Sequence, residues 1–198
     1  MKKIKPILVT GLPRSGTTFL STILKECNDL FYFDEPFNKL WGLKNIKHFY
    51  PSPNSYYKTK VDSLFNNKFE FSVGPKKNNL KYLTKKIFGN KIVLSSLLYK
   101  YFFYKKKKLL IKDPTAAFLS NYFQEKHNCK IIVIIRHPMA FINSQIRMSW
   151  DIKNFNDFLN QHEIKKFLKK SEINNLKKKL SYFERNAYMW LVVNKIIL

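Results

Sequence analysis

The stretch that most constrains this chain lies near its start, where a short apolar run leads into a loop with two glycines. Residues 7–10 predict a buried strand, and the apolar side chains that begin at Phe19 recur at the spacing of one helix face, which predicts a helix over residues 17–26. A strand, a glycine loop and a helix N-terminus in this order bind anions, because the backbone amides and the helix end carry partial positive charge. The sequence therefore predicts an anion site, and we expect the anion to be a phosphate.

The loop also indicates which kind of phosphate it binds. Gly11 and Gly16 have the spacing of a nucleoside triphosphate loop, but Thr17 replaces the lysine that such a loop places after its second glycine. The cationic side chain is Arg14 instead, whose planar guanidinium suits a tetrahedral oxyanion. We therefore expect one terminal phosphate that carries a transferable group, without a metal ion. The alternative is a tight turn that binds nothing.

The same loop resembles a known family. The run Pro13-Arg14-Ser15-Gly16-Thr17-Thr18 is similar to the 5′-phosphosulfate loop of sulfotransferases, enzymes that use 3′-phosphoadenosine 5′-phosphosulfate (PAPS). The resemblance implies a P-loop-like site for the 5′ end of this nucleotide, in which Arg14 is also a candidate catalytic residue. On this resemblance, the candidate donor-binding residues of the loop are Arg14, Ser15, Gly16, Thr17 and Thr18.

A second part of the pattern begins at the most apolar strand of the chain. Residues 131–135 are all Ile or Val, as expected for a strand buried on both faces of a parallel sheet. Arg136 follows, Pro138 suits the start of a helix, and Ser144 comes eight residues after Arg136, about two turns into that helix. An arginine and a hydroxyl in these positions can contact one phosphate from two sides. The arrangement resembles the 3′-phosphate motif of sulfotransferases, which implies that Arg136 and Ser144 bind the 3′-phosphate of PAPS.

Acidic residues follow another short apolar strand, predicted over residues 30–33. Asp34 and Glu35 stand at its end, on the same rim as the glycine loop if the fold is α/β, and Pro36 favours an extended backbone at Glu35. Glu35 is therefore a candidate general base, although the residues alone equally allow an acid that caps the next segment. The Glu-Pro pair resembles one found in several carbohydrate sulfotransferases, which implies that Glu35 takes the proton of the acceptor hydroxyl.

The strand predicted over residues 109–112 ends in Lys112-Asp113-Pro114. Sulfotransferases similar to this chain often show Lys-Asp-Pro at a strand end, and the resemblance implies that Lys112 neutralises the migrating sulfuryl group or orients the acceptor, as a third candidate catalytic residue. Asp113 can also be interpreted as the magnesium-binding acid of a phosphoryl-transfer enzyme. A P-loop kinase-like phosphoryl transferase is therefore the alternative function, and the missing loop lysine is unfavourable to it.

The formal net charge of +24 suggests a further anionic partner. Lysine is abundant together with Asn, Ile, Phe and Tyr, however, as a strongly AT-biased genome would produce, and we expect no nucleic-acid partner. The apolar and aromatic residues 92–104 precede Lys105 to Lys108, which marks either a membrane-surface contact or a solvated helix end. A non-catalytic binder of polyanions or membrane surfaces is therefore a second alternative.

The length and composition fit one domain over residues 1–198 with a substantial core. Cys27 and Cys129 are the two cysteines and show neither a disulfide framework nor metal spacing, so we expect a reducing, cytoplasmic location, with peripheral membrane contact allowed. No run of ~18 apolar residues occurs, so no membrane span is expected. Residues 39–90 do not distinguish a small insertion from part of an acceptor cleft.

Together these patterns predict a three-layer α/β fold with a mostly parallel sheet of four or five strands, whose rim carries Arg14, Glu35, Lys112 and Arg136. The resemblance covers residues 5–198 and implies transfer of a sulfuryl group from PAPS to a hydroxyl of a carbohydrate, with no metal. Because family members usually continue past the apolar helix in which this chain stops, we expect a C-terminal truncation. The sequence makes no prediction of oligomeric state.

Overall fold

The computed structural model of the chain describes residues 4–39, 41–71, 97–148, 158–176 and 180–198. Its centre is a four-stranded, all-parallel sheet in the order β2-β3-β1-β4. The strands are β1 (Ile7–Gly11), β2 (Leu30–Asp34), β3 (Lys108–Lys112) and β4 (Lys130–Ile134). All four lie within one residue of their predicted bounds, and the predicted α/β class is confirmed.

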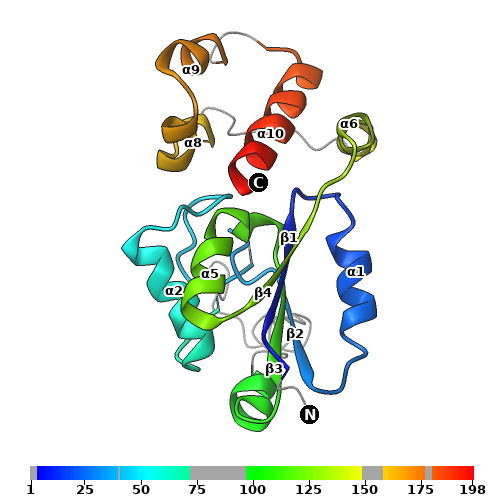
Figure 1. The fold of residues 1–198 in the computed structure, drawn as a ribbon, viewed down its shortest axis with the longest axis vertical. Helices are drawn as coiled ribbons and strands as arrows, with labels where there is room; N and C mark the ends of the chain where they lie inside the picture. Colours follow the sequence, from blue (N-terminus) through cyan, green and yellow to red (C-terminus); the bar gives the residue numbers. More distant parts are fainter. Residues whose placement is uncertain (1–3, 40, 72–96, 149–157, 177–179) are drawn as a thin grey trace, which may run out of the picture.

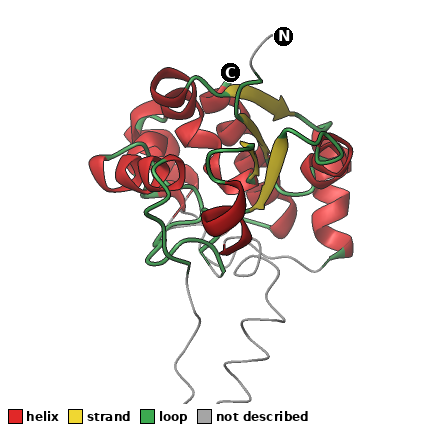
Figure 2. Cartoon of the chain, turned by 90° about the horizontal axis from the view of Figure 1, so that it is seen from below, coloured by secondary structure: helices red, strands yellow, loops and turns green. Residues whose placement is uncertain are grey.

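Helices cover both faces of the sheet, as Figures 1 and 2 show. Helix α1 (Thr17–Leu24) lies on one face, and α2 (Ser55–Phe65) and α5 (Ser120–His127) lie on the other. Alternate side chains of a strand point to opposite faces, so Leu8 packs into the core beneath α2 and α5, whereas Val9 packs into the smaller core beneath α1. The three predicted layers are therefore present.

Further helices gather beyond the C-terminal ends of the strands (Figure 1). Leu12, in the loop after β1, is buried in one apolar cluster with Phe118, Phe141 and Val193 of these helices. The cluster therefore holds these helices at the edge of the sheet where the parallel strands end, which we call the rim. The helices are η2 (Pro114–Leu119), α6 (Pro138–Arg147), α8 (His162–Phe167), α9 (Lys170–Leu176) and α10 (Tyr182–Ile197), while η1 (Tyr99–Phe103) precedes β3 at the opposite end.

Strand β4 corrects one prediction. It lies at the edge of the sheet beside β1, so residues 131–134 are only half-buried, and Ile135 just beyond the strand is exposed. Ile131 packs against the core on one face and Ile132 and Ile134 pack against the core on the other, so both faces are covered as expected, but the burial is only partial. A run of β-branched residues indicates a strand, but whether that strand is central or lateral depends on pairing with segments far away in the sequence.

Helix α1 begins at Thr17 as predicted and ends at Leu24, two residues earlier than expected. Leu20 and Leu24 pack against the sheet, but Phe19 and Ile23 are exposed, so the predicted apolar face is only half correct. The small residues Thr17 and Ser21 are buried in their place. A small buried side lets the helix approach the strands closely.

In the described ranges, no helix has both the length and the apolar composition needed to cross a membrane. Residues 92–96 of the predicted apolar run, and residues 72–90 of the unassigned segment, lie outside those ranges.

Candidate active site

The glycine loop has positive φ angles at both of its glycines and at Arg14 between them. Gly11 has a φ of 139°, and a Cβ at this position would collide with the carbonyl oxygen of Ile134 in β4. Gly16 has a φ of 104° and caps α1, and no heavy atom beyond its chain neighbours lies within 4 Å of the place where a Cβ would stand. The loop therefore leaves β1 in close contact with β4 and keeps open space at the helix N-terminus, where an anion is favoured.

Three predicted donor-binding residues come together across the rim. Nη1 of Arg136 donates a hydrogen bond to the carbonyl oxygen of Arg14 at 2.8 Å, and Nε of Arg14 donates to Oγ of Ser144 at 3.1 Å. These pairs are 122 and 130 residues apart in sequence. Arg136 follows β4, and α6 begins at Pro138 and carries the almost fully buried Ser144 two turns further on. The loop after β1 is thus joined by hydrogen bonds to both members of the arginine–serine pair.

The other loop residues lie at the start of α1. Thr17 is buried at the first position of the helix, and Ser15 is buried in the turn, where its amide donates to the carbonyl oxygen of Leu12 at 3.1 Å. Thr18 is exposed. The hydroxyl of Thr18 is therefore open to a ligand from solvent, whereas the backbone amides of the loop and of the first helical turn supply the remaining donors.

Trp190 of α10 supports Arg136, a role that the sequence did not reveal. Its indole Nε1–H donates a hydrogen bond to the backbone carbonyl oxygen of Arg136 at 2.8 Å. Tryptophan usually finds a hydrogen-bond partner for its N–H when the ring is buried, but the sequence does not say which carbonyl it will be. The last helix of the chain is thereby linked to the strand end that carries the arginine.

Glu35 and Lys112 meet on the other half of the rim. Nζ of Lys112 pairs with the carboxylate of Glu35 and lies 3.1 Å from Oδ1 of Asp34. The side chains of Lys112 and Glu35 are only 6% and 16% exposed, and Nδ2 of Asn38 donates to Oε2 of Glu35 at 2.7 Å. Burial lowers the pKa of Lys112, but pairing with Glu35 and Asp34 outweighs burial and raises it, so the ammonium stays charged. Asn38 had not been predicted as a site residue.

The backbone of Glu35 corrects another expectation. Its φ of 49° lies in the left-handed region, not in the extended region that Pro36 favours. Hydrogen bonds on both sides hold this conformation: the amide of Glu35 donates to the carbonyl oxygen of Lys112 at 2.7 Å, and the amide of Asn38 donates to the carbonyl oxygen of Glu35 at 3.1 Å. A strained backbone held in this way is common at functional sites.

Asp113 ties the turn after Glu35 to β3. Its Oδ2 accepts a hydrogen bond from the amide of Phe37, and its Oδ1 accepts from both the amide and the hydroxyl of Thr115, at 2.8 and 2.7 Å. Burial raises the pKa of Asp113 to about 7, although these donors pull the pKa down. Both carboxylate oxygens thus accept hydrogen bonds within the protein interior. This is the arrangement of a structural residue and not of a magnesium ligand that points toward the rim.

The sheet order sets the sequence of these groups along the rim. Glu35 follows β2, Lys112 ends β3, Arg14 follows β1 and Arg136 follows β4, so they stand in the order of the strands. Neighbouring strands are about 4.8 Å apart, which puts the strand end before Glu35 about 10 Å from that before Arg14. One half of the rim therefore carries the glycine loop and two arginines, and the other half carries a carboxylate paired with an ammonium. Among the described residues, no three His, Cys, Asp or Glu side chains group as metal ligands would.

Comparison with known proteins adds one match to this geometry. The model of a family described as the sulfotransferase family matches residues 6–186, which include every predicted site residue and all four strands. No curated protein matches the chain.

Proposed function

Since this chain belongs to the sulfotransferase family, we propose that it transfers a sulfuryl group from PAPS to a hydroxyl of a carbohydrate. Family membership supports sulfuryl transfer as the reaction. PAPS as the donor and a carbohydrate as the acceptor are our proposals, and they rest on the residues of the two half-sites. The observation that carries the donor proposal is the contact between the glycine loop and the arginine–serine pair, through Arg14, Arg136 and Ser144.

The proposed donor site uses both ends of one nucleotide. The loop amides, Thr17 and Thr18 would hold the 5′-phosphosulfate at the N-terminus of α1, where the helix dipole favours negative charge. Arg136 and Ser144 would hold the 3′-phosphate. Nε of Arg14 bonds to Oγ of Ser144, so residues proposed for the 5′ end and for the 3′ end lie close together, which supports one nucleotide as the ligand of both. The two arginines supply positive charge without a metal ion.

The proposed chemistry is a direct displacement. The acceptor oxygen forms a bond to sulfur while the bond from sulfur to the bridging phosphate oxygen breaks, which yields a sulfate ester and adenosine 3′,5′-bisphosphate. Glu35 takes the proton of the acceptor hydroxyl. Arg14 and the loop amides stabilise the charge that develops on the bridging oxygen, and preorganised donors of this kind typically contribute about 3 kcal/mol each.

Lys112 has a role on the acceptor side in this proposal. Its ammonium pairs with the carboxylates of Glu35 and Asp34, so it holds the Glu35 side chain in place at the rim. That it also neutralises the migrating sulfuryl group stays a prediction. The Glu-Pro pair, which is similar to that of carbohydrate sulfotransferases, supports a sugar hydroxyl as the acceptor.

Ligand binding tests the donor site. Isothermal titration should show that adenosine 3′,5′-bisphosphate binds at least tenfold more tightly than ATP with magnesium, because the site offers two separate anion contacts. Arg136→Ala should weaken the bisphosphate by roughly 10- to 100-fold, as expected for loss of a charge-assisted contact worth about 1.5–3 kcal/mol, and should leave 5′-AMP almost unchanged. A preference for ATP with magnesium would replace the proposal with a phosphoryl transferase.

The matched control is Glu35→Gln, which changes the acceptor half only. It should bind adenosine 3′,5′-bisphosphate like the unaltered protein, yet transfer labelled sulfate from PAPS to a glycan panel at least about 100-fold more slowly, since general base catalysis contributes at that level. Loss of nucleotide affinity in this variant, or unchanged transfer, would contradict the assignment of Glu35.

A further inference from the structure

Exposed aromatic side chains and lysines lie side by side where η1 leads into β3. Tyr101 and Phe102 are 76% and 62% exposed, and Leu97 and Leu98 are exposed as well. Residues 97–108 contain five lysines and no acidic residue. We call the aromatic–lysine patch the seven exposed residues Leu97, Leu98, Tyr101, Phe102, Lys105, Lys106 and Lys108.

The core holds the segment beneath this patch firmly. Tyr99 and Phe103, which flank the exposed pair, pack on Phe31 of β2 with ring centroids 5.1 and 5.4 Å apart. Their packing leaves Tyr101 and Phe102 on the outside. Large apolar side chains close together at the surface indicate an interaction site, because removing apolar area from water is favourable.

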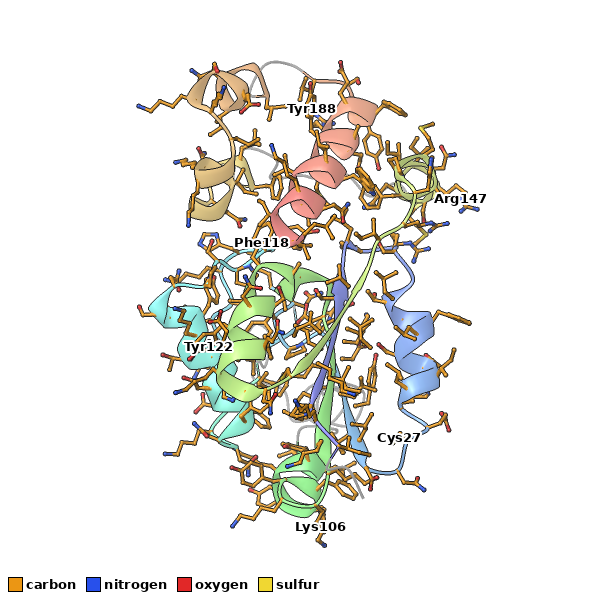
Figure 3. The ribbon with its side chains drawn as sticks, in the orientation of Figure 1. Cys27, Lys106, Phe118, Tyr122, Arg147 and Tyr188 are labelled. Carbon is orange, nitrogen blue, oxygen red and sulfur yellow. The ribbon has the colours of Figure 1, made fainter. Side chains whose placement is uncertain are left out.

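The patch lies at the end of the molecule opposite the candidate active site. All strands are parallel, β3 begins at Lys108, and the amide of Lys108 donates to the carbonyl oxygen of Asp29 in the connection before β2, at 2.8 Å. Figure 3 shows Lys106 and Cys27 near this end, and Arg147 and Tyr188 toward the other. A surface that covered the patch would therefore leave the nucleotide-binding rim open to solvent.

We propose that the aromatic–lysine patch docks on the surface of an anionic lipid bilayer. Aromatic rings favour the interface between headgroups and acyl chains, and lysines beside them are attracted by anionic headgroups. The exposed cations of the patch are lysines, which act as point charges and not as the planar forks that recognise a single phosphate ester. Glu26 and Asp29 are the exposed acids on the nearby connection, and Lys25 offsets part of their charge.

Vesicle binding by the full chain tests this proposal. Sedimentation with phosphatidylcholine vesicles that contain about 30% phosphatidylserine should carry the protein down, whereas pure phosphatidylcholine vesicles should not. The double variant Lys105→Gln, Lys106→Gln removes two positive charges. It should bind the anionic vesicles about 30-fold more weakly, because each lysine near an anionic bilayer raises the affinity about fivefold. Tyr101→Ser with Phe102→Ser should weaken it further, and high salt should release the protein.

A matched variant controls for net charge and surface apolar area. Lys165→Gln, Lys166→Gln and Phe49→Ser remove two exposed lysines and one exposed aromatic side chain elsewhere, and should leave vesicle binding within twofold. Equal loss of vesicle binding in this control and in the Lys105→Gln, Lys106→Gln variant, or no loss in the latter, would overturn the proposal. The same variants should bind adenosine 3′,5′-bisphosphate normally, so failure here is separate from failure of the proposed function.

The orientation has its own readout. Cys27 is exposed at the patch end and Cys129 is buried, so an environment-sensitive dye can be attached to Cys27 alone. Its emission should shift to the blue with anionic vesicles. The same dye on Tyr188→Cys, in a Cys27→Ser background, should not respond. A response at position 188 and none at Cys27 would overturn the proposed orientation.

Discussion

The Asp113 side chain is fully buried, and its surroundings shift its pKa in opposite directions. Burial raises its pKa to about 7, while hydrogen bonds from Thr115 and from the amide of Phe37 lower the pKa. The bond to Phe37 also fixes the turn that presents Glu35, whose left-handed backbone is held by Lys112 and Asn38. One buried carboxyl therefore connects the stability of the fold to the position of the candidate base.

The pH dependence of stability tests this description of Asp113. The folded pKa of about 7 lies above the unfolded value of about 3.9, so the neutral form is favoured in the folded state. The contribution of Asp113 to the free energy of unfolding is therefore fully present below about pH 4 and is lost as the pH rises to about 7, by at most about 1.4 kcal/mol per pH unit.

Urea unfolding of the unaltered protein and of Asp113→Asn, at about pH 5 and pH 8, isolates this group. From pH 5 to pH 8 the unaltered protein should lose more than about 1 kcal/mol of unfolding free energy relative to the variant. A difference between the two proteins that does not change with pH would show that the carboxyl titrates as it does in the unfolded chain.

Helix α10 joins the helices beyond the strand ends to the part of the rim that carries Arg136. Its N-terminus is closed by a capping box, in which the Ser181 hydroxyl accepts from the amide of Glu184 and the Glu184 carboxylate accepts from the amide of Ser181. Met189, Val192 and Val193 bury its inner side beside Phe141 of α6. An element that is packed in this way can hold the Arg136 carbonyl in place through the indole of Trp190.

Trp190→Phe tests whether this helix positions the arginine. The variant keeps most of the aromatic packing and loses the N–H that bonds to Arg136, a contact worth about 1 kcal/mol. The dissociation constant of adenosine 3′,5′-bisphosphate should rise about fivefold, with little change for 5′-AMP. Trp41→Phe, an exposed tryptophan of the loop after β2, serves as the control and should change neither. Equally weaker binding of both nucleotides would indicate that the substitution loosens the packing of the helices beyond the strand ends as a whole.

At the scale of the whole molecule, the candidate active site and the proposed membrane-docking patch lie at opposite ends of the parallel sheet. The strands end at the candidate active site and begin near the aromatic–lysine patch. The formal net charge of +24 gives the molecule a positive field at long range. Such a field concentrates anionic ligands and speeds their encounter with the protein.

The field predicts a salt dependence of nucleotide capture. The association rate constant of adenosine 3′,5′-bisphosphate should fall at least about tenfold between 0.01 and 0.15 M ionic strength, as the Debye length shrinks from about 30 to 8 Å. Stopped-flow measurements can follow this, with uncharged adenosine as the control ligand. A rate constant independent of salt would mean that the global charge does not steer the donor.

Much of this protein is predictable from its sequence because the features concerned are local. The four strands are short apolar runs, and Gly11 and Gly16 stand where the backbone requires positive φ. Arg136 and Ser144 belong to one strand–helix unit, so their eight-residue spacing already places them near each other. The phosphate roles proposed for these residues rest on the family resemblance and not on the spacing alone.

Tertiary structure alone decided the arrangement of these parts. The order β2-β3-β1-β4 put the apolar β4 at an edge, brought Arg14 to Ser144, and paired Glu35 with a lysine 77 residues away. The packing of α10 also determined that the indole N–H of Trp190 bonds to the Arg136 carbonyl. These contacts depend on how separate elements pack, and packing is set by the summed burial of many side chains, which no local run of the sequence contains.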